Sequence, residues 1–375
     1  MKKLISVIAP KLSRIPIALV LLITIISCFG FVLMYSAAQG HFSPWASKQM
    51  FHFAIFFPMM IAIGLVNLKF WYKSSYLFYY SALLLLLLMF LLGHTAMGAT
   101  RWIDLGPIKL QPSELMKICV IFALARYFHD LGNKEIKLHQ LISPIIMLLI
   151  PAFLVIKQPD LGTGVIILSI GAIIFFIANV PKWFFIAGAA MLAVALPLTW
   201  QFLYDYQKNR ILNFLNPEQD RLGSGYNIIQ SKIAIGSGGF FGKGFMQGSQ
   251  SQLEFLPEHQ TDFIFTMLSE EWGFLGASLT LIAYIILIFY SYLIAINAKS
   301  QFGRILALGT ASMFSLHILI NVSMVMGLLP AVGIPLPLLS YGGTNMMTIL
   351  IGFGLIISVH IHNRIIIENH LKSFF

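Results

Sequence analysis

Five carboxylates lie within a stretch of 18 residues that leads directly into an apolar segment. They are Glu254, Glu258, Asp262, Glu270 and Glu271, whereas the whole chain of 375 residues contains only 14 Asp and Glu residues. The 27 residues that follow carry no charge. A carboxylate at the boundary between a polar and an apolar segment is partly removed from water, and such an acid is a candidate general base. We therefore expect chemistry in this stretch.

Asp262 is the candidate base among these acids, because it stands where the polar segment ends and the apolar one begins. Asp262, Thr266 and Glu270 follow at intervals of four residues, which predicts one shared helix face, so Glu270 could line the same cavity. A purely structural role is the alternative, since Asp is also a good helix N-cap. We interpret Glu271 as structural and assign no role to Glu254 and Glu258.

A second charged group opens another predicted helix, at about residues 113–129. Ser113 is the expected N-cap, and Glu114 in the first turn is favoured by the helix dipole. Glu114 and Lys117 are three residues apart, so they share a face and can form an ion pair. Either this pair satisfies itself at the membrane interface, or it lines a polar cavity inside a helix bundle.

Three loops add further candidates. Arg101 lies in the loop 98–106, and Asp160 lies in a Pro-Asp turn that is either ordinary turn chemistry or another site carboxylate. The loop Gly236–Gly244 resembles a phosphate loop but lacks the Walker spacing. Its amides and nearby cations could hold an anionic group, or it could be a plain connector.

The composition is that of an integral membrane protein. The chain is 58% hydrophobic and 10% charged, with a mean hydropathy of +0.84, whereas soluble domains carry about 25% charged residues. The net charge of +10 is explained by basic residues retained on the cytoplasmic side, so it does not indicate nucleic-acid binding. Cys28 and Cys119 lie in apolar segments and predict neither a disulfide framework nor a metal site.

Uncharged windows predict nine membrane spans, because the last window is divided in two by a segment rich in Gly and Pro. The charged helix at 113–129 is a tenth span. With ten spans and a cytoplasmic N-terminus, most Lys and Arg residues of the short loops lie on the cytoplasmic side, as membrane proteins prefer, whereas nine spans would place most of them outside. We therefore predict an all-α polytopic membrane protein with ten transmembrane helices, cytoplasmic N- and C-termini and one domain, 1–375. The segment 205–261, between the seventh and eighth helices, is predicted to be a long outer-face loop. The uncharged windows are 15–38, 49–68, 74–93, 140–156, 161–181, 183–204, 272–298 and 305–363.

Several ordered motifs together resemble the SEDS family of bacterial membrane glycosyltransferases, over nearly the whole chain. The endings 333–337 and 358–362 are similar to the elongation branch of that family rather than to its division branch. The other matching motifs are Gly98–Gly106, Gln111–Glu114 with Lys117, Gln158–Thr163, Gly225–Ser231, Phe255–Glu258, Thr261–Phe265 and Pro335–Gly343.

The resemblance implies an inverting glycosyltransferase of the bacterial inner membrane that polymerises lipid II into peptidoglycan strands during elongation. It places the catalytic residue at Asp262 and the lining of a central cavity at Glu114 and Lys117, with Arg101 and Asp160 as further candidates. It also implies a class B penicillin-binding protein as partner within the elongation complex. A cation must offset charge on the departing diphosphate; basic side chains could do so, and so could a divalent metal ion.

Two other functions stay open from the sequence. A flippase for the lipid-linked precursor would suit many spans and an intramembrane ion pair, although the acids gather at one face and no broken pair of helices indicates a second gate. A catalytically silent scaffold is the third hypothesis, but it would have no need for desolvated charge.

Overall fold

The computed structural model describes residues 10–368 of the chain with short gaps. The residues outside the description are 1–9, 93, 97–98, 105–108, 133–135, 200, 202–204, 218–223, 254, 257 and 369–375.

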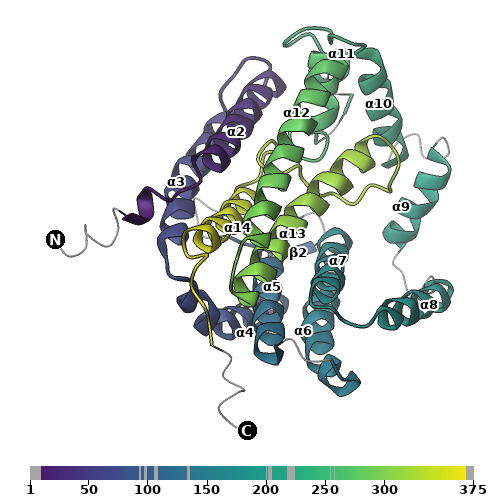
Figure 1. The fold of residues 1–375 in the computed structure, drawn as a ribbon. Coiled ribbons are helices and arrows are strands. Elements are labelled where there is room, and N and C mark those ends of the chain that lie inside the picture. Colours follow the sequence, from purple (N-terminus) through teal and green to yellow (C-terminus); the bar gives the residue numbers. More distant parts are fainter. Residues whose placement is uncertain are drawn as a thin grey trace.

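A helix covers each of the ten segments for which the sequence predicts one, including the charged segment near residue 113 (Figure 1). Seven of them, in the described part of the chain, are long and apolar enough to cross a membrane. The Gly- and Pro-rich segment does divide the last window in two, as predicted. The ten helices are α2 (Ile17–Ala37), α3 (Trp45–Leu65), α4 (Leu68–Leu92), α5 (Pro112–Leu131), α6 (Leu138–Lys157), α7 (Leu161–Ile177), α8 (Lys182–Thr199), α12 (Ile264–Ile296), α13 (Gln301–Val325) and α14 (Gly343–Ile361).

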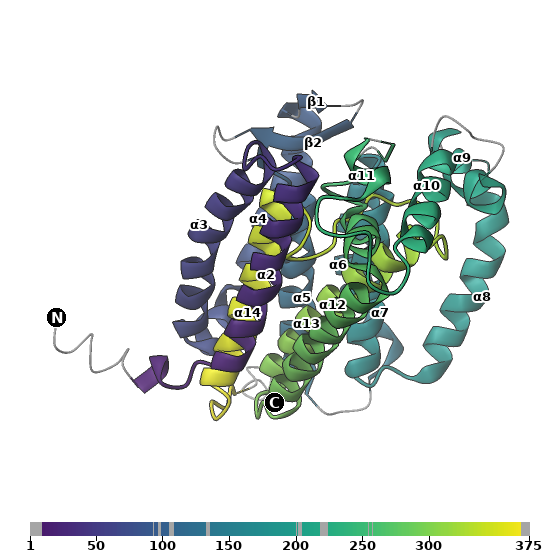
Figure 2. The same cartoon turned by 90° about the horizontal axis from the view of Figure 1, so that it is seen from above.

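The centre of the bundle is formed by α5, α13 and α14, whose side chains are mostly buried. Helices α2, α3 and α4 lie on one side, and α6, α7 and α8 lie on the other (Figure 1). The start of α2 and the end of α14 lie at one end of the bundle, which we call the terminal end (Figure 2). Strands β1 (His94–Ala96) and β2 (Ala99–Asp104) lie at the opposite end, which we call the strand end. Antiparallel pairing continues from β2 to β3 (Lys109–Leu110).

The segment 205–261 is more ordered than the predicted loop. It contains the helices α9 (Asp205–Leu215), α10 (Ser224–Ser237) and α11 (Ser249–Gln252). The Ser231 hydroxyl of α10 lies 2.7 Å from the Thr266 hydroxyl of α12 and also donates to the Val325 carbonyl, at 2.7 Å. The segment is thus packed onto the start of α12 rather than free above the bundle.

Helix α12 is broken at Gly273, which has φ 65° and ψ −163°. In an unbroken helix the amides of residues 274 and 275 would donate to the carbonyls of residues 270 and 271. Here the amides of Phe274 and Leu275 instead donate to the carbonyls of Gly239 and Phe240, at 2.9 and 3.0 Å. The sequence did not predict a broken helix. Among the described helices, Gly273 is the one interior position with non-helical φ and ψ.

The same loop also satisfies the carbonyls that the break leaves open. The amides of Lys243 and Gly244 donate to the carbonyls of Glu270 and Glu271, each at 3.0 Å. The Gly242 amide donates to the Gly238 carbonyl, at 2.8 Å. The hypothesis that the amides of this glycine loop hold an anion is therefore wrong for these three, because they are already used. The loop completes the hydrogen bonding of α12 instead.

We predict that Gly273→Ala destabilises the protein. The combination of φ and ψ at Gly273 is essentially limited to glycine and costs another residue about 1–3 kcal/mol. The added Cβ would also overlap the backbone of the loop at Phe240 and Gly242. Thermal unfolding in detergent should occur at a clearly lower temperature than in the wild type. Gly236→Ala is the matched control, because an added Cβ there meets nothing within 4 Å. Equal unfolding temperatures for the two variants would contradict this account of the break.

Candidate functional site

Asp262 lies in a turn just before α12, between α11 and the first helical residue, Ile264. The N-cap of α12 is Phe263, so Asp262 neither caps this helix nor belongs to it. The predicted helix face shared by Asp262, Thr266 and Glu270 is therefore wrong, and so is the N-cap alternative. The physical reason is the turn itself, in which the amides of Thr261 and Phe263 both donate to the Glu258 carbonyl.

The backbone around Asp262 is held by the segment that joins α13 to α14. The Asn321 amide of α13 donates to the carbonyls of Asp262 and Ile334, at 2.8 and 2.7 Å. The Ser340 hydroxyl donates to the Thr261 carbonyl, at 2.6 Å, and the Tyr341 amide donates to the Gln260 carbonyl, at 2.9 Å. These bonds fix the turn while leaving the carboxylate of Asp262 unused.

The Asp262 side chain is half-buried, and no donor in the described part of the chain is hydrogen-bonded to its carboxylate. It lies against Gly333, where an added Cβ would sit 3.4 Å from Oδ2. Burial raises the pKa of Asp262 to about 7; the negative charge of Glu258 adds to this effect, and the positive charge of Arg210 opposes it. A carboxylate with a pKa near neutrality and free oxygens can accept a proton, as a general base must.

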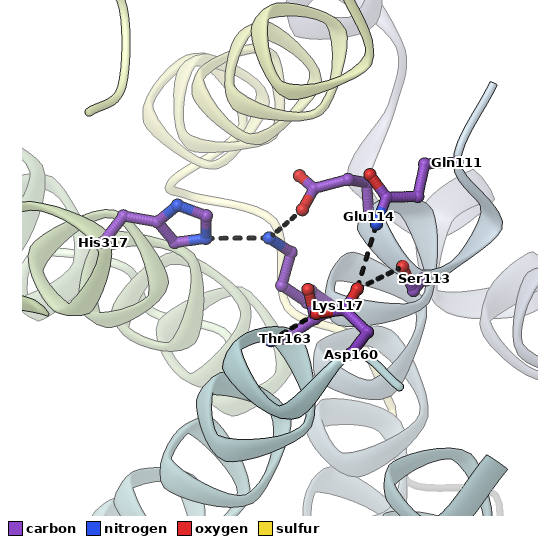
Figure 3. A network of polar contacts seen from close by, with 7 residues as sticks. All are labelled: Gln111, Ser113, Glu114, Lys117, Asp160, Thr163 and His317. Carbon is purple, nitrogen blue, oxygen red and sulfur yellow. Dashed lines mark hydrogen bonds and ion pairs between the residues drawn. The ribbon is translucent and has the colours of Figure 1, made fainter. Parts of the chain in front are cut away.

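Lys117 is completely buried inside the bundle and has two partners (Figure 3). Its Nζ lies 2.7 Å from Oε1 of Glu114 and 2.8 Å from Nε2 of His317. An ammonium group can only donate, so Nε2 accepts and the proton of a neutral His317 is on Nδ1. Two of the three N–H groups of Lys117 are used in this way, and one is left for a further acceptor. The predicted ion pair is confirmed, and it lies inside the bundle.

Helix α13 connects this pair to Asp262. His317 faces Lys117, and Asn321, four residues later on the same helix face, holds the backbone of Asp262. Four residues of helix rise by about 6 Å, so the two contacts lie one turn apart along α13. Lys117 and Asp262, 145 positions apart in the sequence, are thereby brought to one region of the bundle.

Asp160 joins the same region through the start of α5 (Figure 3). Its Oδ1 accepts the Thr163 amide at 3.1 Å, which caps α7, and its Oδ2 accepts the Gln111 amide group at 3.0 Å. The Ser113 hydroxyl also donates to Oδ2, at 3.4 Å. The prediction that Ser113 caps α5 is wrong: Pro112 is the first helical residue, so Gln111 is the N-cap.

Glu270 and Glu271 are both buried and both bonded. Glu270 forms an ion pair with Lys243 at 2.7 Å and accepts the Gln250 amide at 2.9 Å. Glu271 accepts the Ser36 hydroxyl of α2, at 2.5 Å. Glu270 therefore points at the glycine loop rather than sharing a face with Asp262, and the structural interpretation of Glu271 agrees with its contact.

One predicted candidate cannot be placed by its side chain: Arg101 belongs to β2, but its side chain lies outside the description. Glu254, to which the sequence assigned no role, also lies outside the described residues. In the remainder of the chain, no three His, Cys, Asp or Glu side chains come together as a metal site. The described residues thus offer a divalent cation no ready-made three-ligand site.

His317 and Asn321 are the site residues that the sequence analysis missed. Each is a polar residue within the long uncharged window at 305–363, and both are buried. Their spacing of four residues on one helix was the available signal, because buried polar groups in a membrane span are costly unless they are bonded.

The model of the FtsW/RodA/SpoVE family of cell cycle proteins matches residues 13–365. The chain belongs to this family. Among relatives with the same family fold, the peptidoglycan glycosyltransferase MrdB of Escherichia coli strain K12 is 44% identical over 277 residues, covering 73% of this chain and 74% of that protein. The peptidoglycan glycosyltransferase RodA of Treponema pallidum is 30% identical over 418 residues, covering 91% and 96%.

A solved protein chain has the same architecture. It comes from a structure of a peptidoglycan synthase complex that coordinates polymerization and crosslinking. That chain is 29% identical, with a TM-score of 0.81, and the match covers 92% of this chain and 97% of that one.

We predict that Glu114 and Lys117 depend on each other for stability. Removing one member of a buried ion pair leaves an uncompensated charge, which costs about 3–5 kcal/mol, whereas replacing both costs much less. Glu114→Gln and Lys117→Met should each lower the thermal unfolding temperature strongly, and the double variant should recover part of the loss. Lys69→Met, at an exposed lysine, serves as the control and should change little. Additive losses in the double variant would show that the two side chains act separately.

Proposed function

We propose that this protein is a peptidoglycan glycosyltransferase that polymerises lipid II into glycan strands during cell elongation and shape maintenance. Its family membership and its similarity to MrdB and RodA support this activity. The observation that carries the assignment of the site is the half-buried carboxylate of Asp262, which has a pKa of about 7 and no hydrogen-bond donor among the described residues. The buried carboxylates of Glu114, Asp160, Glu270 and Glu271 all accept hydrogen bonds from neighbouring donors, so their oxygens are less available to a substrate hydroxyl.

Asp262 acts as the general base in this proposal. It takes the proton from the acceptor sugar hydroxyl while that oxygen forms a bond to the anomeric carbon of the donor sugar. The bond between this carbon and the diphosphate oxygen breaks, and its electron pair leaves with the diphosphate. Attack from the opposite side inverts the anomeric centre. A diphosphate is a good leaving group, so a second carboxylic acid is not required to protonate it, in contrast to a glycosidase.

Cations beside Asp262 would stabilise the charge that develops on the departing diphosphate. Arg210 of α9 faces Asp262 closely enough to oppose the rise in its pKa. The contact of Lys117 with α13 lies one turn from the contact of α13 with the Asp262 backbone, and the described residues use two of the three N–H groups of Lys117. We propose that Glu114 and His317 position Lys117, and that Asp160 positions the start of α5 beside it. Arg101 stays a candidate for binding the substrate. We propose that Glu270 stabilises the glycine loop through its ion pair with Lys243.

The proposed topology is ten membrane spans with cytoplasmic termini in the bacterial inner membrane. Asp262 then lies at the strand end, on the outer face, and α9–α11 form an outer-face cap. Ten helices at the predicted positions and seven clear candidate spans support this arrangement. We also propose a class B penicillin-binding protein as partner, because the similar solved chain comes from a complex that coordinates polymerization with crosslinking.

We predict that Asp262→Asn abolishes polymerisation of labelled lipid II by the purified protein together with its transpeptidase partner. The amide has the same shape but cannot accept the proton, so the rate should fall by about 10²–10⁴-fold, the usual contribution of a general base. Glu258→Gln, at an exposed acid in the same turn, is the control and should keep activity. Equal polymer from Asp262→Asn and wild type would refute the assignment. Movement of lipid II across sealed vesicles that survives Asp262→Asn, without any polymer, would favour the flippase hypothesis.

We predict that kcat/KM for lipid II polymerisation rises with pH through a midpoint near 7. The base must be deprotonated, and burial raises its pKa to about 7, so the enzyme is inactive well below this pH and active above it. Because the charge of Glu258 contributes to the raised pKa, Glu258→Gln should move the midpoint to lower pH. A midpoint that stays in place in Glu258→Gln, or a rate that falls with rising pH, would contradict the role of Asp262.

A further inference from the structure

A cavity of about 460 Å³ lies at the end of α12 that is remote from Asp262. Three separate parts of the chain line it: the segment that leads into α2, the last two turns of α12 and the end of α14. Its lining includes the basic side chains Arg14, His360 and Arg364, and the polar side chains Ser13, Tyr290 and Asn363.

Positive charge gathers at this cavity without a balancing acid. Arg14 and Arg364 are both exposed, and neither forms an ion pair in the part of the chain that the structure describes. No Asp or Glu is among the residues that line the cavity. A third cation, Lys11, lies close by, since burial and the charges of Lys11 and Arg14 lower the pKa of His362. An anion in the cavity would therefore meet at least two unpaired guanidinium groups.

Arg14 and Arg364 each belong to a turn that is stabilised by hydrogen bonds to backbone carbonyls. On the α2 side, the Arg14 amide donates to the Lys11 carbonyl at 3.1 Å, and the Lys11 ammonium donates to the Leu65 carbonyl at 3.0 Å. On the α14 side, the Ile365 amide donates to the His362 carbonyl at 3.0 Å, and the Lys299 amide donates to the Asn363 carbonyl at 3.1 Å. The two guanidinium groups therefore start from fixed points on either side of the cavity.

The rest of the cavity wall is apolar. Ile15, Ile17 and Ile361 line it, and Ile17 begins a helix that is long and apolar enough to cross a membrane. A small hydrophilic anion would gain nothing from these side chains. A ligand with a charged head and an apolar tail would use both the cations and the apolar wall.

We propose that this cavity binds the phosphate headgroup of an anionic phospholipid, held between Arg14 and Arg364. Guanidinium groups bind phosphate oxygens in pairs of parallel hydrogen bonds, and basic pockets between membrane helices are typical sites for such headgroups. The hydroxyl groups of Ser13 and Tyr290 can donate further hydrogen bonds. With the proposed topology the lipid belongs to the cytoplasmic leaflet. Binding there would join the beginning of α2 to the end of α14, two segments about 350 positions apart in the sequence.

The test compares lipids retained by the full-length protein in native mass spectrometry after purification from vesicles of equal parts phosphatidylglycerol and phosphatidylcholine. Wild type should retain phosphatidylglycerol in preference to phosphatidylcholine. Arg14→Gln/Arg364→Gln should lose this preference by about tenfold or more, because each basic group beside an anionic headgroup contributes several-fold. Lys69→Gln/Lys73→Gln removes the same charge from exposed lysines outside the cavity and should retain the preference.

Two results would overturn the proposal. One is an unchanged phosphatidylglycerol preference in Arg14→Gln/Arg364→Gln, provided that the variant unfolds at a temperature close to that of Lys69→Gln/Lys73→Gln. The other is displacement of phosphatidylglycerol by millimolar inorganic phosphate, which would mean that the cavity recognises a free phosphate and not a lipid. Retention of phosphatidylglycerol in the presence of that phosphate supports the proposal, because the apolar wall then contributes to binding.

Discussion

The bonding of a lysine ammonium at the centre of an apolar bundle is the constraint on which this structure depends. Lys117 has no exposed surface, so its charge must be met by partners inside the protein. Glu114 supplies the opposite charge from the same helix, and His317 supplies a neutral acceptor from α13. The position of α13 relative to α5 is thereby set by a polar contact. Since Asn321 follows on the same face of α13, the contact also determines where the turn that carries Asp262 is held.

The carboxylates of this protein differ mainly in whether they have donors. Glu270 and Glu271 brace the start of α12, Asp160 caps α7, and Glu114 neutralises Lys117. Asp262 is held through its backbone instead, by Asn321, and no donor among the described residues is bonded to its carboxylate. A site that fixes an acid by its main chain keeps the side-chain oxygens available for a proton, whereas a site that fixes it by its carboxylate occupies those oxygens with donors.

The helices were predictable because a membrane span needs about 20 apolar residues, and such windows are visible directly in the sequence. Even α5, with four charged residues, could be recognised from the distribution of Lys and Arg among the loops. The start of α12 was not predictable, because the turn before it depends on contacts with the segment after α13. His317 and Asn321 were missed for a similar reason: a lone polar residue in an apolar window reveals its partner only when the helices are packed. The glycine loop was misread because its amides are used by a helix that follows it in the chain.

That loop has a mechanical consequence for α12. Four hydrogen bonds between the loop Gly239–Gly244 and α12 replace the helical hydrogen bonds that are missing at Gly273. The two parts of α12 are therefore connected as one rigid helix only while these four bonds are made. Withdrawal of the loop would uncouple residues 264–272, which directly follow Asp262, from the rest of the helix. The first turns of α12, next to the turn of Asp262, therefore take their direction partly from this loop and not from the helix alone.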